Sequence, residues 1–174
     1  MRGIFIGRFQ PLHLGHVKAI TWILENVDEL IIGIGSSNVA LSFKNPFTVG
    51  ERIEMIFKTL RNMRILDRIY ICTIPDTYGE HSLWHAYVKH CCPDFQVAYT
   101  NDEFTKVCLE YGGYRVENIP FFDREKYNST RVRLAMAKEL EEWKFLVPES
   151  VVEIIERIRG VERVKRLAII EKVI

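Results

Sequence analysis

The sequence is poor in the features that mark membrane-bound, secreted and nucleic-acid-binding proteins. No apolar run approaches the ~18 residues that a membrane-spanning helix needs, and residues 1–6 are too short for a secretory signal. The formal net charge is only +1, so no overall field would attract a nucleic acid or an anionic membrane. We therefore expect a cytoplasmic, globular protein with no membrane and no nucleic-acid partner.

Cysteine and metal-binding patterns are equally scarce. The chain has four cysteines: Cys72, Cys91, Cys92 and Cys108. Their spacing fits neither a zinc ribbon nor a CxxC redox pair, which favours free thiols in a reducing compartment. The histidines at 13 and 16 lack the i, i+4 spacing and the glutamate of a helical zinc motif, which argues against zinc.

What the chain does have is a regular alternation of short apolar stretches and helical patterns. Strands are expected at residues 1–6, 30–34, 68–74, 95–100 and 114–119. Helices are expected at 14–27, after Thr48, at 82–91, at 103–111 and from Ser129 onward. This alternation predicts an α/β fold, with a parallel sheet covered by helices on both faces. In such a sheet the ligand site lies at the carboxyl ends of the strands.

Helix boundaries and domain limits follow from local signals. Thr48 and Glu51 have the spacing of a capping box, Pro148 marks a helix restart, and Gly160 marks a break. No linker or repeat divides the chain. We expect residues 1–147 to form the α/β domain, with 148–174 as a C-terminal helical extension of it. The apolar tail could pack on its own domain or form a homo-oligomer contact.

The loop after the first strand, "GRFQPLHLGH", carries the strongest chemical signal. Gly7 allows close approach of the backbone to a ligand, and Arg8 is a fixed cation with a planar donor fork. His13 and His16 lie near a helix N-terminus, where free N–H groups favour anions. Gly15 keeps the space between the histidines open. The loop lacks the GxGxxG fingerprint, so these residues indicate a phosphate site of a different kind.

This loop resembles the HxGH signature of the nucleotidyltransferase superfamily. The segment "NSTRVR", residues 128–133, resembles the second signature of that superfamily, S-T-x-x-R. Together with "VDELIIGIGSS", "NPFTVGER" and the C-terminal tail, these motifs are similar to the archaeal nicotinamide-nucleotide adenylyltransferase family over nearly the whole chain. The resemblance implies a Rossmann-like doubly wound parallel sheet with C-terminal helices. It also implies transfer of AMP from ATP to nicotinamide mononucleotide (NMN), giving NAD and pyrophosphate.

The resemblance also implies which residues carry the reaction. The catalytic residues would be Arg8, His13, His16, Lys44 and Arg133. The ATP site would comprise Gly7, Arg8, Phe9, His13, Gly15, His16, Asn101, Asn128, Ser129, Thr130 and Arg133. The NMN site would comprise Ser36, Ser37, Asp76, His81 and Trp84. Mg²⁺ would bridge ATP oxygens, with no metal ligand from protein side chains. The resemblance also implies that the protein forms a homo-oligomer.

Several readings stay open at this point. Trp84 could stack on the nicotinamide ring or simply pack in the core, Asp76 could bind the acceptor or cap a helix, and Asn101 could touch the nucleotide or turn the chain. Lys44 stands where the archaeal family often has arginine, which keeps the charge but loses the bidentate fork. His81 stands where a small amide is expected, so the acceptor could be another phosphorylated compound: a flavin nucleotide, phosphopantetheine or an alcohol phosphate. A non-catalytic nucleotide sensor and an RNA-binding module are the alternatives from other classes.

Overall fold

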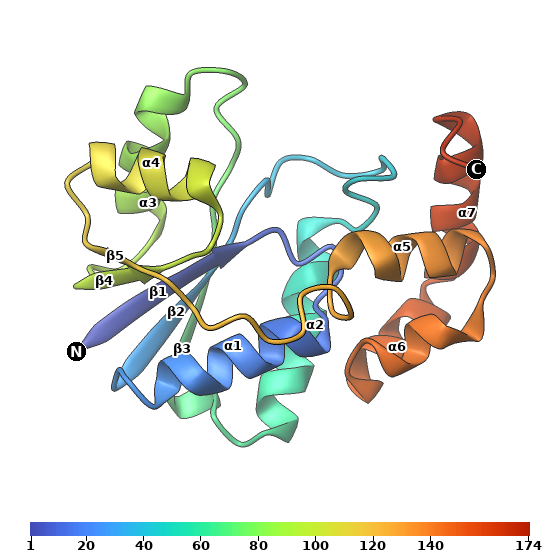
Figure 1. Ribbon diagram of the computed structural model, residues 1–174, viewed down its shortest axis with the longest axis horizontal. Coiled ribbons are helices and arrows are strands. Elements are labelled where there is room, and N and C mark those ends of the chain that lie inside the picture. Colours follow the sequence, from blue (N-terminus) through green and yellow to red (C-terminus); the bar gives the residue numbers. More distant parts are fainter.

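Five parallel strands form the centre of the computed structural model, which describes residues 1–174, the whole chain (Figure 1). The strands are β1 (Arg2–Gly7), β2 (Glu29–Ile34), β3 (Ile69–Thr73), β4 (Val97–Tyr99) and β5 (Val116–Glu117). They lie in the order β3-β2-β1-β4-β5. The chain thus builds outward from β1 to β3 and then returns to add β4 on the other side of β1. This arrangement confirms the predicted Rossmann-like doubly wound sheet.

Seven α-helices lie on the two faces of the sheet or beyond one of its ends. They are α1 (Leu14–Leu24), α2 (Val49–Asn62), α3 (Trp84–Cys91), α4 (Glu103–Tyr111), α5 (Ser129–Ala137), α6 (Glu149–Arg157) and α7 (Gly160–Ile170). Figure 1 shows α3 and α4 on one face of the sheet and α1 on the other, with α5, α6 and α7 grouped beyond the sheet. No helix combines the length and the apolar character needed to span a bilayer.

Successive residues of a strand point to opposite faces of the sheet. Helices cover both faces, so both sets of side chains are buried. Phe5 and Ile32 belong to a cluster of 31 buried residues, which also holds the buried faces of α1 and α2. Ile4 and Ile31 belong to a second cluster of 6 buried residues, which also contains Val88 of α3 and Leu109 of α4. The apolar strands therefore position two separate helical layers around one rigid sheet.

The C-terminal helices share the larger of these two cores. Val151 and Ile154 of α6 and Val164 of α7 are members of the 31-residue cluster. Arg163 of α7 donates to both carboxylate oxygens of Glu51 on α2, at 2.6 and 2.8 Å. The tail thus packs against its own chain through apolar contacts and a bidentate ion pair.

The local capping signals gave the helix starts correctly. Thr48 Oγ1 accepts from Glu51 N, and Glu51 Oε2 accepts from Thr48 N, so the predicted capping box is present at α2. Pro148 is the N-cap of α6. The predicted break lies one residue before Gly160, at Arg159, whose φ of 55° is left-handed.

Three other elements are shorter in the structure than the sequence predicts. The helix predicted to run to Val27 ends at Leu24, because Arg68 Nη2 binds the carbonyls of both residues, at 2.7 and 2.6 Å, and so holds the chain in a turn. The last strand has two residues instead of the range 114–119, since the backbone N–H of Ile119 donates to a side chain and not to the sheet. The strand expected at 95–100 spans only 97–99.

Candidate functional site

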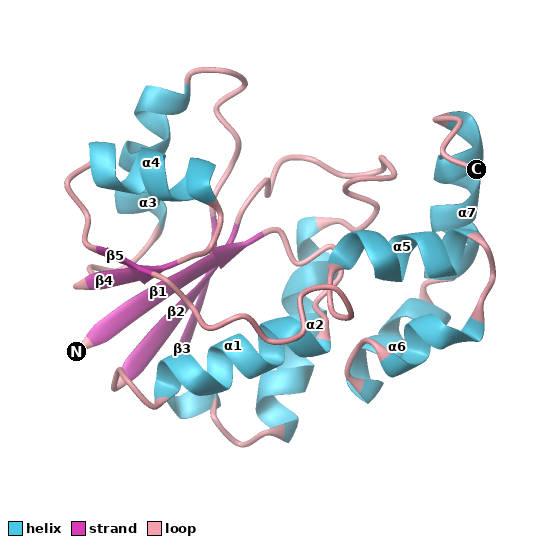
Figure 2. Ribbon diagram, in the orientation of Figure 1, coloured by secondary structure: helices cyan, strands magenta, loops and turns pink.

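Two pockets adjoin at the carboxyl edge of the sheet, where Asp102 lines both. The larger pocket has a volume of about 660 Å³ and the smaller one about 230 Å³. Figure 2 shows the loops after β1 and β2 leaving the sheet at this edge. The pockets therefore lie where the strand order reverses, at the place where doubly wound sheets bind ligands.

The pockets bring together most of the residues that the sequence singled out. The larger pocket is lined by Gly7, Arg8, Ser36, Lys44, Asp76, His81 and Trp84. The smaller pocket is lined by His13, Gly15, His16, Asn101, Asn128 and Ser129. Four other predicted site residues line neither: Phe9, Ser37, Thr130 and Arg133. The division separates the expected acceptor residues from most of the expected ATP residues.

The two histidines of the first loop are locked together at the start of α1. His13 is the N-cap, and its Nδ1 accepts from His16 N at 3.3 Å, while His16 Nδ1 accepts from His13 N at 3.2 Å. The rings stack with centroids 3.6 Å apart. Because each Nδ1 accepts a backbone N–H, the proton of each neutral ring is at Nε2. Both imidazoles therefore offer an Nε2–H donor.

Burial keeps these rings uncharged. Desolvation, with a smaller contribution from the charge of Arg133, lowers the pKa of His13 to about 3. Desolvation and the neighbouring His13 lower the pKa of His16 well below its usual range. At neutral pH the site thus presents neutral hydrogen-bond donors at a helix N-terminus, a combination suited to phosphate oxygens.

Gly15 is required by this arrangement. A Cβ at this position would lie 3.0 Å from the His13 ring and 3.0 Å from the Cβ of Tyr127. A side chain would push the imidazole or the 127 backbone out of place. The expectation that glycine keeps this space open is consistent with these distances.

The second signature forms the start of α5, facing the first loop. Asn128 is the N-cap, and its Oδ1 accepts from Arg131 N at 2.8 Å. Ser129 Oγ donates to the carbonyl of Pro11 at 3.3 Å, which links the two signatures. The exposed Thr130 follows Ser129 at this helix N-terminus. A second set of free N–H groups thus lies beside the histidines.

Arg133 lies behind the loop and not in a pocket. Only 3% of the residue is exposed; Nη1 donates to the carbonyl of Gln10 at 2.9 Å and Nη2 to Thr130 Oγ1 at 3.2 Å. Its Nε is buried without a hydrogen-bond partner. Desolvation, and then the charge of Arg8, lowers its pKa to about 10, so the guanidinium stays charged at neutral pH.

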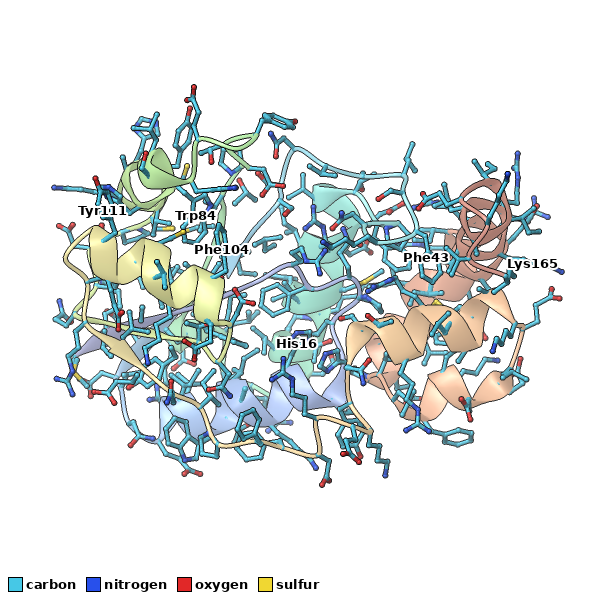
Figure 3. All side chains as sticks on the ribbon, turned by 45° about the horizontal axis from the view of Figure 1, so that its top comes forward. His16, Phe43, Trp84, Phe104, Tyr111 and Lys165 are labelled. Atoms are coloured by element: carbon cyan, nitrogen blue, oxygen red, sulfur yellow. The ribbon has the colours of Figure 1, made fainter.

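The larger pocket has a cationic side and an aromatic side. Arg8 Nη1 donates to Asn45 Oδ1 at 3.3 Å, which places the guanidinium beside the loop that carries Lys44. Across the pocket, Figure 3 shows Trp84 and Phe104 close to each other on the α3 and α4 side. Phe104 meets the ring of His81 edge-on, with centroids 4.8 Å apart. Such a pocket fits a ligand with a flat ring and an anionic group.

Asp76 and Asn101 each organise a loop. Asp76 Oδ1 accepts from Ser36 Oγ at 2.9 Å, which joins the loops after β2 and β3. Asn101 binds the backbone of Ile119 with both ends of its amide, donating at 2.6 Å and accepting at 2.9 Å. Both side chains thus shape pocket walls while lining the pockets themselves.

Among the residues in and around the site that the predicted site list does not contain, three are informative. Phe104 is 56% exposed and reads as a surface residue of α4, so its place in the pocket depends on tertiary structure. Gln10 pairs with the backbone of Phe47 through two hydrogen bonds of 2.9 Å. Arg52 is fully buried on α2, and the available signal was a charged residue on the apolar face of an amphipathic helix.

Comparisons with known proteins place the chain in a family. The cytidylyltransferase-like family matches residues 4–135. A nicotinamide-nucleotide adenylyltransferase from Caldivirga maquilingensis is 47% identical, over 95% of this chain and 93% of the relative. One from Pyrobaculum arsenaticum is 45% identical, over 97% of this chain and 94% of the relative.

Solved structures agree on the fold. A bifunctional NMN adenylyltransferase/ADP ribose pyrophosphatase from Francisella tularensis superposes with a TM-score of 0.71 at 22% identity, over 97% of this chain and 56% of that chain. Another structure of that kind of protein, complexed with AMP and a manganese ion, has a TM-score of 0.67. On the family match and on the identity to whole curated relatives, the chain belongs to the cytidylyltransferase-like nucleotidyltransferases and, among them, to the nicotinamide-nucleotide adenylyltransferases.

Proposed function

We propose that this protein transfers AMP from ATP to NMN, releasing pyrophosphate and forming NAD. The observation that carries the proposal is the pair of adjoining pockets, one lined by phosphate-binding donors and one by cations and aromatic rings. Relatives with identities of 45–47% over nearly the full chain bear the name of this activity. Both substrates are phosphorylated, and the two pockets supply donors for two phosphate groups.

ATP would occupy the smaller pocket and the groove between the two signatures. The Nε2–H groups of His13 and His16 would donate to its phosphates, with His16 nearest the α-phosphate. The start of α5, with Ser129 and Thr130, would hold the β- and γ-phosphates. Arg133 would act from behind, through its charge and its bond to Thr130. Mg²⁺ would be bound through ATP, with no protein side chain as a ligand, and would offset negative charge on the phosphates.

NMN would occupy the larger pocket. Trp84 would stack on the nicotinamide ring, with Phe104 and His81 closing the same side. Ser36, the neighbouring Ser37 and Asp76 would contact the ribose side. Arg8 and Lys44 would hold phosphates from two sides, near the boundary between the pockets. This placement brings the acceptor phosphate toward the α-phosphate of ATP.

The chemistry then needs positioning and charge stabilisation, and no general base. A phosphate oxygen of NMN is already anionic at neutral pH. It forms a bond to the α-phosphorus while the bond from that phosphorus to the bridging oxygen of pyrophosphate breaks. Charge moves onto the leaving pyrophosphate, where donors fixed beforehand stabilise the transition state.

Product analysis tests the proposal. Purified protein would be incubated with ATP, Mg²⁺ and NMN, and in parallel with flavin mononucleotide or phosphopantetheine in place of NMN. NAD formed together with equimolar pyrophosphate supports the proposed acceptor. Turnover with a different acceptor alone keeps the nucleotidyltransferase chemistry and overturns the acceptor. Absence of turnover with every acceptor favours a nucleotide-binding sensor.

The His16→Ala variant tests the mechanism separately. Loss of a donor to the reacting phosphate should lower kcat by ~10²-fold or more, as for other lost transition-state donors. His81→Ala is the matched control, because it removes an exposed imidazole from the acceptor pocket and should change the KM for NMN more than kcat. Turnover of the His16 variant near the wild-type rate would refute the assignment.

The C-terminal helices support two further proposals. Their apolar residues share the core of residues 1–147, so 148–174 would be an extension of one domain, and truncation after 147 should abolish folding. Ile169 and Ile170 of α7 are exposed at 55% and 71%. These side chains fit self-association in a homo-oligomer, which light scattering would measure.

A further inference from the structure

Arg52 is a buried cation that forms no ion pair with a carboxylate. The residue lies on α2 and has 0% exposure. All its hydrogen bonds go to backbone carbonyls: Nε to Thr48 at 3.3 Å, Nη1 to Arg8 and to Gly35 at 2.9 Å each, and Nη2 to Ser36 at 3.0 Å. A charge in this setting is costly to bury, so its retention calls for a specific role.

Three of the four carbonyls that Arg52 binds belong to residues that line the larger pocket. Arg8 follows β1, while Gly35 and Ser36 follow β2, and all three line that pocket. The guanidinium therefore ties the ends of two adjacent strands to the first turn of α2. Its planar fork suits this task, because one rigid group serves carbonyls that come from different directions.

One of these residues has a backbone conformation that needs support. Ser36 has a φ of 47°, in the left-handed region that residues with a Cβ rarely adopt. Arg52 Nη2 holds its carbonyl, and Asp76 Oδ1 accepts its hydroxyl at 2.9 Å. With both contacts in place, Ser36 points toward the loop after β3. Without the guanidinium, the strained residue keeps only the Val39 N–H on its carbonyl, at 3.2 Å, and the contact of its hydroxyl with Asp76.

We propose that Arg52 is a positioning residue for the acceptor nucleotide: it fixes the strand ends that carry Arg8 and Ser36 and thereby sets the affinity of the larger pocket. The proposal rests on the proposed function, which places NMN in that pocket. Arg52 makes no hydrogen bond to any residue lining the smaller pocket. Its loss should therefore affect the acceptor more than ATP.

The chain offers a matched control at the opposite edge of the sheet. Arg68 also donates to three backbone carbonyls, from Leu24, Val27 and Asp28, at 2.6–2.8 Å. These carbonyls lie in the turn between α1 and β2, at the edge where the strands begin. Arg68→Lys thus removes the same kind of contact without touching either pocket.

The test is steady-state kinetics of Arg52→Lys and Arg68→Lys, with ATP and NMN varied separately at a temperature below the unfolding of both variants. Lysine keeps the charge and loses the fork. Arg52→Lys should raise the KM for NMN about tenfold, because the residues that line the acceptor pocket are held less firmly. The KM for ATP should change less than threefold. Arg68→Lys should lower the melting temperature and leave both KM values unchanged.

Three outcomes overturn the proposal: an unchanged KM for NMN in Arg52→Lys, equal increases in both KM values, or the same increase in Arg68→Lys. A loss of kcat alone would show a smaller active fraction and also overturn it. If Arg52→Lys does not fold, Arg52→Gln supplies the comparison, since a neutral side chain is cheaper to bury. A wild-type protein that forms no NAD refutes the proposed function itself, whereas a wild type that forms NAD with these variant results refutes Arg52 alone.

Discussion

Acidification from pH 7.5 to pH 5 should destabilise the protein by about 2 kcal/mol through His13 alone. The folded state holds this imidazole at 7% exposure with a pKa of about 3, whereas the unfolded chain has the ordinary value of about 6.5. A depressed folded pKa means that the unfolded state binds the proton more tightly. The stabilisation is therefore complete above pH 6.5 and is lost as the pH falls from there toward 3.

The magnitude follows from the two pKa values. At pH 5 the unfolded imidazole is almost fully protonated and the folded one almost fully neutral. The difference of about 1.5 pH units from 6.5 corresponds to about 2 kcal/mol at 1.36 kcal/mol per unit. At pH 7.5 the imidazole is almost fully neutral in both states, so protonation of His13 causes almost no loss of stability there.

His13→Asn isolates this effect. The amide oxygen of asparagine can cap α1 as Nδ1 does, since asparagine is a preferred N-cap residue, but it does not titrate. Urea unfolding at pH 7.5 and pH 5 should show a loss of stability that is about 2 kcal/mol smaller in the variant than in the wild type. His90→Asn removes an exposed imidazole from α3 and should keep the wild-type loss. Parallel losses in the wild type and His13→Asn would refute the reasoning.

Three further predictions concern single residues. Gly15→Ala should lower kcat/KM at least ~10-fold in steady-state assays, because its Cβ would lie 3.0 Å from the His13 ring. Trp84→Ala should raise the KM for NMN ~10-fold and leave the KM for ATP unchanged, as loss of a stacking ring would; equal shifts would contradict the acceptor placement. Arg163→Ala should lower the unfolding free energy by ~1 kcal/mol with normal activity, because a bidentate, partly buried pair with Glu51 is lost. The burial of Glu51 is outweighed by its bonds to Arg163 and Thr48, so its pKa is lowered; the difference in urea unfolding should be complete above about pH 4.5 and shrink as the pH falls below that value.

The sequence predicts the ordering of elements well, because apolar periodicity and capping residues are local. Thr48 and Glu51, three residues apart in the sequence, form the capping box that begins α2. Strand ends are harder to predict. The backbone of Ile119 binds the side chain of Asn101 instead of continuing the sheet, and the spacing of apolar residues gives no sign of this contact. Errors of boundary therefore concentrate where a distant side chain takes over a backbone group.

The same distinction separates the site residues that the sequence could and could not supply. The histidines lie in one contiguous motif, and their residue types are enough to predict a phosphate site. Their neutral protonation state cannot be predicted from the sequence, because it depends on burial. Phe104 and Arg52 reach the site only through the packing of α4 and α2. The strand ends and their polar residues pointed to the loops, and the family resemblance then assigned roles to them, whereas the groups that hold those loops in place required the structure.

The carboxyl edge of a parallel sheet poses an electrostatic problem for a protein that binds polyanions. Carbonyl oxygens at the strand ends carry partial negative charge and would repel phosphates. Arg52 covers the carbonyls of Arg8, Gly35 and Ser36, and Arg133 covers that of Gln10. Each buried guanidinium thus has two effects: it satisfies backbone carbonyls and it adds a positive charge close to the site. On this argument, the two buried arginines would support the proposed phosphate sites from below, although neither lines either of the two pockets.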